Sequence, residues 1–242
     1  MLSRILPRPG TQSTGIFKQV YNGLFNNQCL LCAAPCETGH SLCPACFAEL
    51  PRTTPCCPRC AAPQPHGLVC GACLKKPVFT RAIIPFQYTG QNLRLIHLFK
   101  FNKRPVAVAS LLSELKSQLL QEKQKPDALL PIPSHWRRLI WRGYDSPLLI
   151  ARYLKRHTGI PLRHALRRIR HTPHQLGQPR KQRLKNMRGA FRCRQDVRGL
   201  HIALIDDVYT TGSTAREAAQ TLLKAGAKQV DIYCLARTPE KF

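Results

Sequence analysis

One stretch decides the fold of this 242-residue chain: Ile202-Ala203-Leu204-Ile205-Asp206-Asp207-Val208-Tyr209-Thr210-Thr211-Gly212-Ser213-Thr214. Its first four residues are apolar, which predicts a strand that is buried on both faces. Apolar residues after the stretch recur at helical spacing, which predicts a helix with one buried stripe. The residues of this stripe are Ala215, Ala218, Ala219, Leu222 and Leu223. We therefore expect a strand, a loop and a helix.

The loop of this unit carries groups that suit a phosphorylated sugar. Asp206 and Asp207 stand at the predicted end of the strand, and the segment Thr210–Thr214 adds hydroxyls and a glycine before the helix. The unpaired backbone N–H groups and the dipole of a helix N-terminus favour an anion. The two aspartates would bind the diol of the sugar or its metal ion, and the loop hydroxyls and backbone amides would bind the phosphate.

Two other interpretations of this loop fit the sequence less well. The two acids could merely cap a turn, but such a pair at the end of an apolar strand is unusual in a chain with only 12 acidic residues. A P-loop requires a lysine directly before its hydroxyl residue, and the loop has none. The loop is therefore expected to bind phosphate through amides and hydroxyls alone.

The run LIDDVYTTGST, residues 204–214, resembles the phosphoribosyl-diphosphate signature of the type I phosphoribosyltransferases. The resemblance implies that Asp206 and Asp207 lie at the ribose hydroxyls and that the following loop holds the 5-phosphate. It also implies that Mg²⁺ accompanies phosphoribosyl diphosphate (PRPP), the donor. The residues expected to bind PRPP are Asp206, Asp207, Val208, Thr210, Thr211, Gly212, Ser213 and Thr214.

The chain is strongly basic, with a formal net charge of +26 and a pI of about 10.3. Residues 137–198 hold eighteen Lys and Arg against two acids, whereas residues 1–80 hold seven against two. This excess indicates a polyanionic partner, nucleic acid or pyrophosphate, with a solvated basic face as the alternative. The first ten residues lack an apolar signal region, and no apolar run is long enough to span a membrane. We therefore expect a soluble cytoplasmic protein.

Cysteines mark a separate N-terminal unit, because ten of the twelve lie between Cys29 and Cys73. Eight of them form the CxxC pairs Cys29/Cys32, Cys43/Cys46, Cys57/Cys60 and Cys70/Cys73. A CxxC turn places two thiolates within reach of a tetrahedral metal, so eight thiolates predict two structural zinc ions. Disulfides would need an oxidising compartment, and a thioredoxin-like redox pair would be single.

Loop lengths favour sequential zinc sites, the first from the two leading pairs and the second from the two trailing pairs. Ten residues separate Cys32 from Cys43, and nine separate Cys60 from Cys70. A cross-braced arrangement, first pair with third, stays open. The two leftover thiols, Cys36 and Cys56, could substitute for a ligand, whereas His40 and His66 are expected to be solvated turn residues.

Strands and helices alternate through the rest of the chain, which predicts an α/β fold with a parallel sheet. The expected strands are 81–88 and 128–133, and the expected helices are 92–101, 106–120 and a further one that ends at Leu154. Ligands bind beyond the carboxyl ends of such strands. Candidates to hold pyrophosphate or DNA therefore follow the strand that ends at Pro133: Ser134, Arg137, Arg138 and Arg142.

Two further features bear on nucleic acid. The basic segment 163–183 is interrupted by prolines and a glycine, so it is predicted to be a mobile lid, a nucleic-acid arm or a simply exposed loop. Trp136, Trp141 and Tyr144 lie among arginines and could stack on the bases of a single strand, or pack onto the sheet instead.

Several segments resemble the ComF-type proteins of bacterial DNA competence. They are the paired cysteine knuckles, PIPSHWRR at 131–138, the Arg-Gly-aromatic element at 142–144, the series from Gln175 to Phe191, and the terminal AGAKQVDIYCLART at 225–238. Where that family commonly has Phe-Asn-Gln, this chain has Tyr144-Asp145-Ser146, which removes two amides and adds a charge. We expect an extension at 1–27, a double zinc ribbon at 28–78 and a phosphoribosyltransferase-like domain at 80–242.

Two functions follow from these features. One is a protein that binds PRPP and single-stranded DNA and acts in DNA uptake or processing, with competence proteins as candidate partners. The other is an active phosphoribosyltransferase on a small-molecule acceptor. The sequence shows donor-binding groups but assigns no catalytic base, although His135 and His174 are conceivable.

Overall fold

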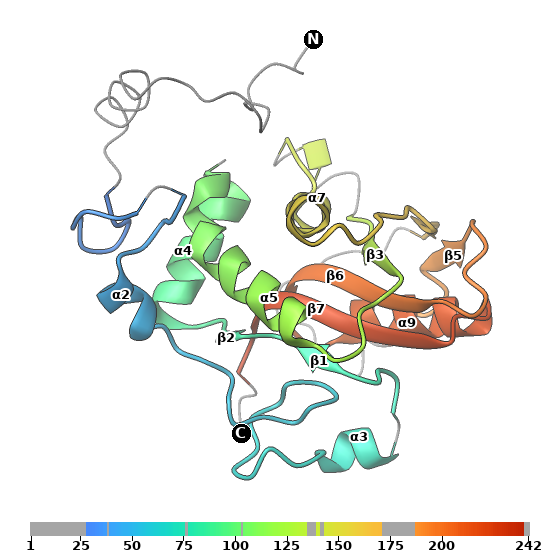
Figure 1. Cartoon of the computed structure of the whole chain (residues 1–242). Helices are drawn as coiled ribbons and strands as arrows, with labels where there is room; N and C mark the ends of the chain where they lie inside the picture. The colour runs from blue at the N-terminus through green and yellow to red at the C-terminus, as the bar shows by residue number, and fades with distance from the viewer. Residues whose placement is uncertain are drawn as a thin grey trace.

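The computed structural model describes residues 28–37, 39–75, 77–102, 104–134, 139–140, 143–170 and 187–239 (Figure 1). The expected extension at 1–27 lies outside these residues. A five-stranded sheet forms the centre of the molecule, and every strand pair in it is parallel. No helix in the described part of the chain is long and apolar enough to cross a membrane.

The sheet has the order β1-β7-β6-β3, and β2 extends the β1 edge along β7. Its strands are β1 (Ala82–Ile83), β2 (Phe86–Gln87), β3 (Ala128–Pro131), β6 (His201–Tyr209) and β7 (Gln229–Arg237). In β6 every residue except Asp206 is buried, as is expected of a central parallel strand. Parallel pairing brings the carboxyl ends of β3, β6 and β7 to one edge of the sheet.

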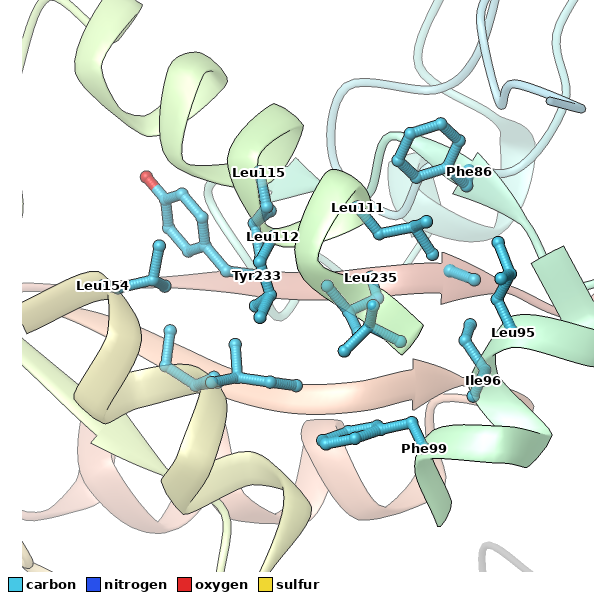
Figure 2. Packing of buried hydrophobic residues seen from close by; sticks show 14 of the residues in the cluster. Phe86, Leu95, Ile96, Phe99, Leu111, Leu112, Leu115, Leu154, Tyr233 and Leu235 are labelled. Atoms are coloured by element: carbon cyan, nitrogen blue, oxygen red, sulfur yellow. The ribbon is translucent and has the colours of Figure 1, made fainter. Parts of the chain in front are cut away.

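Helices cover both faces of the sheet (Figure 1). One face is covered by α4 (Gly90–Phe101), the short 3₁₀ helix η1 (Pro105–Val108), α5 (Ala109–Gln121) and α7 (Ser146–Thr158). The other face is covered by α9 (Ser213–Lys224). Figure 2 shows Leu111 and Leu115 of α5 next to Tyr233 and Leu235 of β7, and Phe99 of α4 beside the neighbouring strand β6. This packing fixes α4 beside the carboxyl end of β6.

The structure confirms the predicted α/β fold and corrects several predicted boundaries. The expected strand 81–88 is split into β1 and β2, because Pro85 interrupts it. The strand predicted at 202–205 continues to Tyr209, so the two aspartates lie within β6 and not after it. Leu223 was expected on the buried stripe of α9, but 38% of it is exposed.

A two-stranded antiparallel sheet was not predicted. It consists of β4 (Leu166–Arg168) and β5 (Phe191–Cys193), and it packs through Leu166 and Phe191 against the core that also contains α9. Its strands are only three residues long, so the sequence has no alternation that would reveal them. This β4–β5 sheet presents arginines to solvent.

The cysteine-rich unit, which includes α2 (Pro44–Ala48) and α3 (Gly71–Lys75), packs onto the β1–β2 edge and α5. Leu42 and Leu50 belong to the same apolar cluster as Phe86. Backbone contacts add to this, since the N–H of Ala82 donates to the carbonyl of Pro58 at 2.8 Å. The domain boundary expected between 78 and 80 stays a prediction, because the core continues across it.

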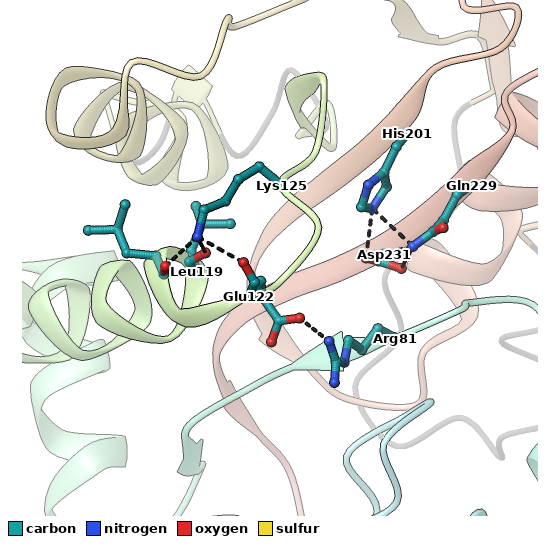
Figure 3. Close-up of polar contacts among 8 residues, drawn as sticks. Arg81, Leu119, Glu122, Lys125, His201, Gln229 and Asp231 are labelled. Carbon is teal, nitrogen blue, oxygen red and sulfur yellow. Dashed lines mark hydrogen bonds and ion pairs between the residues drawn. The ribbon is translucent and has the colours of Figure 1, made fainter.

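Polar pairs hold the amino ends of the strands, at the end of the sheet away from the two aspartates (Figure 3). His201 Nε2 lies 2.7 Å from Asp231 Oδ2, and both side chains are almost fully buried. Arg81 and Glu122 form an ion pair that joins β1 to the end of α5. These contacts are structural, since they lie at the edge opposite to the carboxyl ends.

Candidate functional site

The structure gathers the eight CxxC cysteines into two clusters of four. One holds Cys29, Cys32, Cys43 and Cys46, and the other holds Cys57, Cys60, Cys70 and Cys73. Within each cluster all four sulfurs lie within 4.8 Å of one another, which confirms sequential pairing and shows that the cross-braced alternative is wrong. Sulfurs 3.7 and 3.6 Å apart occur in the first and second cluster. A tetrahedral zinc with bonds of about 2.3 Å requires about 3.8 Å, so the donor sets fit zinc.

The two clusters repeat one local structure. In each, the sequence Cys-Ala-Ala-Pro ends the first knuckle, at 32–35 and at 60–63. Its first alanine, Ala33 or Ala61, has a positive φ, and the following alanine carbonyl accepts from the N–H of Cys29 or Cys57 at 2.7 Å. Short helices, α2 and α3, then carry the last cysteine of each cluster. The Cys-Ala-Ala-Pro repeat is a sequence signal that the spacing analysis missed.

One thiol in each cluster is set up as a thiolate, the form that binds metal. Burial raises the pKa of Cys29, but backbone N–H groups of Cys43, Cys32 and Leu31 outweigh it and bring the pKa to about 6. Burial also raises the pKa of Cys57, but backbone N–H groups, first that of Cys70 at 3.3 Å from the sulfur, outweigh burial and bring this pKa to about 7.

The leftover cysteines and nearby histidines stay outside the clusters. Burial, with the charges of neighbouring thiolates, raises the pKa of Cys36 to about 11. Burial also raises the pKa of Cys56. His40 and His66 are exposed, as predicted. None of these four residues is among the sulfur ligands that the clusters bring together.

Asp206 and Asp207 lie on β6, just after Ile205, the last residue of β6 that pairs with β3. Asp206 Oδ1 accepts from the backbone N–H of Asp207 at 2.8 Å. Asp207 Oδ1 accepts from the N–H of Val208 at 2.7 Å and forms an ion pair of 2.7 Å with Lys100 Nζ of α4. The Lys100 and Asp207 side chains are each 11% exposed. Their pairing fixes one of the two carboxylates at the rim of the sheet.

A third carboxylate, that of Asp145, lies near Asp207. Asp145 accepts a hydrogen bond of 2.7 Å from the hydroxyl of Ser134, which follows β3. Burial raises the pKa of Asp145, Ser134 opposes the rise, and the negative charge of Asp207 adds to it. The carboxyl edge therefore combines Asp206 and Asp207 with Asp145, Ser134 and Lys100. Sequence reasoning placed Ser134 here but missed the roles of Asp145 and Lys100.

The loop that follows β6 leads directly into α9. Thr210 is exposed and Thr211 is half-buried, and the hydroxyls of Thr211 and Ser213 lie 3.0 Å apart. Gly212 is the residue before the helix and has φ of +71°. A Cβ at Gly212 would lie 2.1 Å from the hydroxyl of Tyr209, so only glycine fits. The loop and the first turn of this twelve-residue helix can accept an anion.

Several predicted residues lie outside the described part of the chain. They are Arg137, Arg138, Arg142, His135, Trp136, Trp141 and residues 171–183 of the expected lid or arm. Among the aromatics considered for base stacking, Tyr144 is described, and its ring packs on Phe99 with centroids 5.6 Å apart. Tyr144 therefore packs against helix α4, and not onto the sheet as the alternative to stacking had it.

The β4–β5 sheet carries a concentration of positive charge. Arg167 and Arg192 stand directly opposite each other in the register and are both exposed. Like charges in this position are destabilising unless something neutralises them. The one acid among residues 163–198, Asp196, forms a bidentate pair with Arg198, which donates from Nε to Oδ1 at 3.0 Å and from Nη2 to Oδ2 at 2.8 Å. Other exposed arginines nearby are Arg163, Arg170, Arg188 and Arg194. This arginine surface of the β4–β5 sheet suits a polyanion.

Family models match both parts of the chain. A model described as a double zinc ribbon domain matches residues 20–74, and one described as a phosphoribosyl transferase domain matches residues 105–241. The second match covers more than half of the chain. It contains the whole of the loop and α9.

Relatives match along most of the chain. DNA utilization protein YhgH from Salmonella typhimurium is 34% identical over 220 residues, which cover 87% of this chain and 96% of that protein. Competence protein F from Haemophilus influenzae is 30% identical over 224 residues, 88% of this chain and 98% of that protein. A purine phosphoribosyltransferase structure from Pyrococcus horikoshii has a TM-score of 0.36 and 22% identity, with coverage of 54% of this chain and 72% of that one.

Proposed function

This chain belongs to the ComF family of competence proteins, and from that premise we propose that it binds PRPP and single-stranded DNA during DNA uptake or processing. Its competence-related role follows from the family. The two ligands are the finer part of the proposal. One observation carries it: two carboxylates on β6 stand directly before a glycine-containing, hydroxyl-rich loop at the start of α9.

Donor binding uses the carboxyl edge of the sheet. Asp206 and Asp207 would take the ribose hydroxyls, and the loop from Thr210 to Thr214 would take the 5-phosphate. Mg²⁺ fits this edge, because the groups gathered there are carboxylate and hydroxyl oxygens, the ligands that it prefers. When bound with the donor, Mg²⁺ would offset the charge of the pyrophosphate. Lys100 would hold the Asp207 carboxylate in its orientation through their ion pair while the sugar binds.

DNA binding is proposed for the arginine surface of the β4–β5 sheet. Its arginines face solvent on two strands that pack against the same core as α9, so the surface adjoins the transferase-like unit. Phosphates of a single strand would relieve the repulsion between Arg167 and Arg192. The zinc ribbons, as closed four-thiolate sites, would contribute structure and not catalysis.

An active transferase on a small acceptor is the second candidate function. The observation that favours it is Asp145, a half-buried carboxyl whose pKa is raised by burial and by the charge of Asp207, and which accepts a hydrogen bond from Ser134. A carboxyl in this position could hold an acceptor amine or take its proton as pyrophosphate leaves. Pyrophosphate release that depends on one added acceptor, and that falls in an Asp145→Asn variant, would establish turnover.

Replacing Asp206 with Asn is expected to weaken PRPP binding at least about tenfold, and replacing both Asp206 and Asp207 about 100-fold or more. A hydrogen bond to a charged group contributes about 1.5–3 kcal/mol, and each 1.4 kcal/mol is a factor of ten. Calorimetry with PRPP and Mg²⁺ measures the change. Asp206→Asn is the cleaner variant, because Asp207→Asn also deprives Lys100 of its charged partner.

The matched control for this experiment is Asp196→Asn. Asp196 also loses one negative charge, but its side chain is 63% exposed and it precedes the amino end of β6. Its variant should bind PRPP like the wild type. Equal affinity of the double aspartate variant and the wild type would contradict the proposed donor site.

Replacing Arg167 and Arg192 with Ser is expected to weaken single-stranded DNA binding and to flatten its salt dependence. Each phosphate contact adds roughly 0.7 to the slope of log affinity against log salt, so the double variant should lose roughly 1.4. Fluorescence anisotropy with a labelled oligonucleotide at several salt concentrations measures both. The control is Arg94→Ser with Arg156→Ser, two exposed arginines on α4 and α7 whose removal lowers the net charge equally. If the control variant lost as much DNA affinity and salt dependence, the proposed binding surface would be wrong.

A further inference from the structure

The second cysteine cluster is in direct contact with the last residue of β7. The guanidinium of Arg237 donates from Nη1 to the backbone carbonyl of Cys60 at 2.7 Å. Cys60 supplies one of the four sulfurs of that cluster. Arg237 is 4% exposed, so this hydrogen bond of a charged group lies inside the protein. Such a bond is sensitive to the position of both partners.

Arg237 also contacts Tyr209, the residue before the phosphate loop. The two residues are partners in the β6–β7 register, and the guanidinium carbon lies 4.9 Å from the centroid of the Tyr209 ring. This distance is within the range of a cation–π contact. Phe79, in the segment that joins the ribbon to β1, packs edge-on against the same ring at 6.3 Å. Tyr209 is 3% exposed, so its ring is held on several sides.

Tyr209 in turn sets the path of the loop. Its hydroxyl and Cζ would lie only 2.1 and 2.4 Å from a Cβ at Gly212, so the ring is packed directly against the backbone of the loop. The backbone of Tyr209 is fixed as well, since its carbonyl accepts from the N–H of Thr238 at 2.9 Å. A shift of the ring would therefore move the loop.

The first cysteine cluster is placed differently. A polar link from its segment to the transferase-like unit joins Ser41 to Ser110 on α5, with the hydroxyls 3.2 Å apart. Its apolar neighbours belong to the cluster on the face covered by α4, α5 and α7, whereas Tyr209 belongs to the cluster on the other face. The contacts that lead to the phosphate loop thus begin at the second site.

We propose that Arg237 and Tyr209 are positioning residues that couple the second zinc site to the phosphate loop, so that zinc there and PRPP strengthen each other's binding. The inference rests on the proposed donor function. Coupling between two sites is reciprocal in free energy, and typical values correspond to roughly 5- to 150-fold in affinity. The first zinc site should lack this coupling.

Cadmium in place of zinc gives a readout that is specific to each site. We expect the ¹¹³Cd spectrum of the full chain to contain two signals, because each cluster offers four sulfurs. The conservative variant Arg237→Lys should displace only the signal of the second site, which assigns it. Addition of PRPP to the wild type should then shift that signal and leave the other in place. Movement of neither signal, or of both equally, would overturn the coupling.

Calorimetry separates the coupling from donor binding itself. Arg237→Met should weaken PRPP binding roughly 5- to 150-fold, and Arg237→Lys should recover part of the loss by restoring a donor and a cation. If the wild type binds PRPP and the Met variant binds it equally well, the inference fails and the donor site stands. If the wild type binds no PRPP, both fail. The cadmium experiment uses only the wild type and the conservative Arg237→Lys variant, so a poorly folding Met variant leaves that test intact.

Discussion

Chelation of the zinc is expected to release about two ions per chain and to unfold the segment 28–75. Structural zinc binding in small peptides is worth roughly 10–16 kcal/mol at neutral pH, and that free energy is folding free energy. The short helices α2 and α3 have five residues each, too few to be stable without the metal. Metal analysis of protein purified without chelator, and circular dichroism before and after chelation, measure the effect.

Removal of the zinc should also destabilise the transferase-like unit, beyond the zinc ribbon itself. Leu42 and Leu50 pack in the same apolar cluster as Phe86 and Leu111, so loss of the ribbon exposes the β2 edge and one side of α5. We therefore expect a lower melting temperature for the transferase-like unit as well. A chelated protein that keeps its melting temperature would show that the two parts are energetically separate.

Single cysteine variants divide the effect between the sites. Cys46→Ser and Cys70→Ser each remove one ligand from a different cluster, and each should reduce the zinc content by about one ion under the four-thiolate argument. Cys36→Ser, which removes a thiol outside the clusters, is the matched control and should keep both ions. Loss of zinc in the Cys36 variant would contradict the observed ligand sets.

Local sequence patterns predicted the parts of this protein that are local in space. The CxxC spacing places both sulfurs of a knuckle within one turn, so the zinc ligands could be named from the sequence. The stretch from Ile202 to Thr214 likewise contains its own strand, loop and helix start. What remained open was the order in which the knuckles pair, because it depends on contacts between separate turns.

Contacts between residues that lie far apart in the chain could not be predicted from the sequence, for a physical reason. Lys100 lies 107 positions before Asp207, and Arg237 lies 177 positions after Cys60. No periodicity connects such residues, since only the folded chain brings α4 beside β6 and the end of β7 beside the ribbon. Asp145 was seen only as a departure from the family pattern, and the structure gives it a partner in Ser134.

The strand end was misplaced for a similar reason. Asp206 and Asp207 are polar, so the apolar run seemed to stop before them, yet β7 continues to pair with β6 as far as Tyr209. Pairing with one neighbour is enough to extend the strand beyond the end of β3. For the proposed donor site, this means that both carboxylates lie on a strand, a rigid element, and that the loop proposed to bind the phosphate begins after it.

Replacing Gly212 with Ala is expected to reduce PRPP binding about 100-fold while most of the fold survives. The new Cβ would lie 2.1 Å from the Tyr209 hydroxyl, a separation that atoms do not tolerate. Tyr209 cannot turn aside, because Phe79 and Arg237 pack against its ring and it is 3% exposed. The loop must move instead, and a displacement of about 1 Å in a binding group can cost about 100-fold.

Gly199→Ala is the control that separates this clash from backbone strain. Gly199 has the same φ of +71° as Gly212, but a Cβ there would meet nothing within 4 Å. Both variants pay the cost of a left-handed alanine, roughly 1–2 kcal/mol of stability, and only Gly212→Ala should lose PRPP. Urea unfolding measures the shared loss, and calorimetry measures the difference. If the two variants bind PRPP equally, the loop geometry does not determine donor affinity, and the phosphate must be held elsewhere at the carboxyl edge of the sheet.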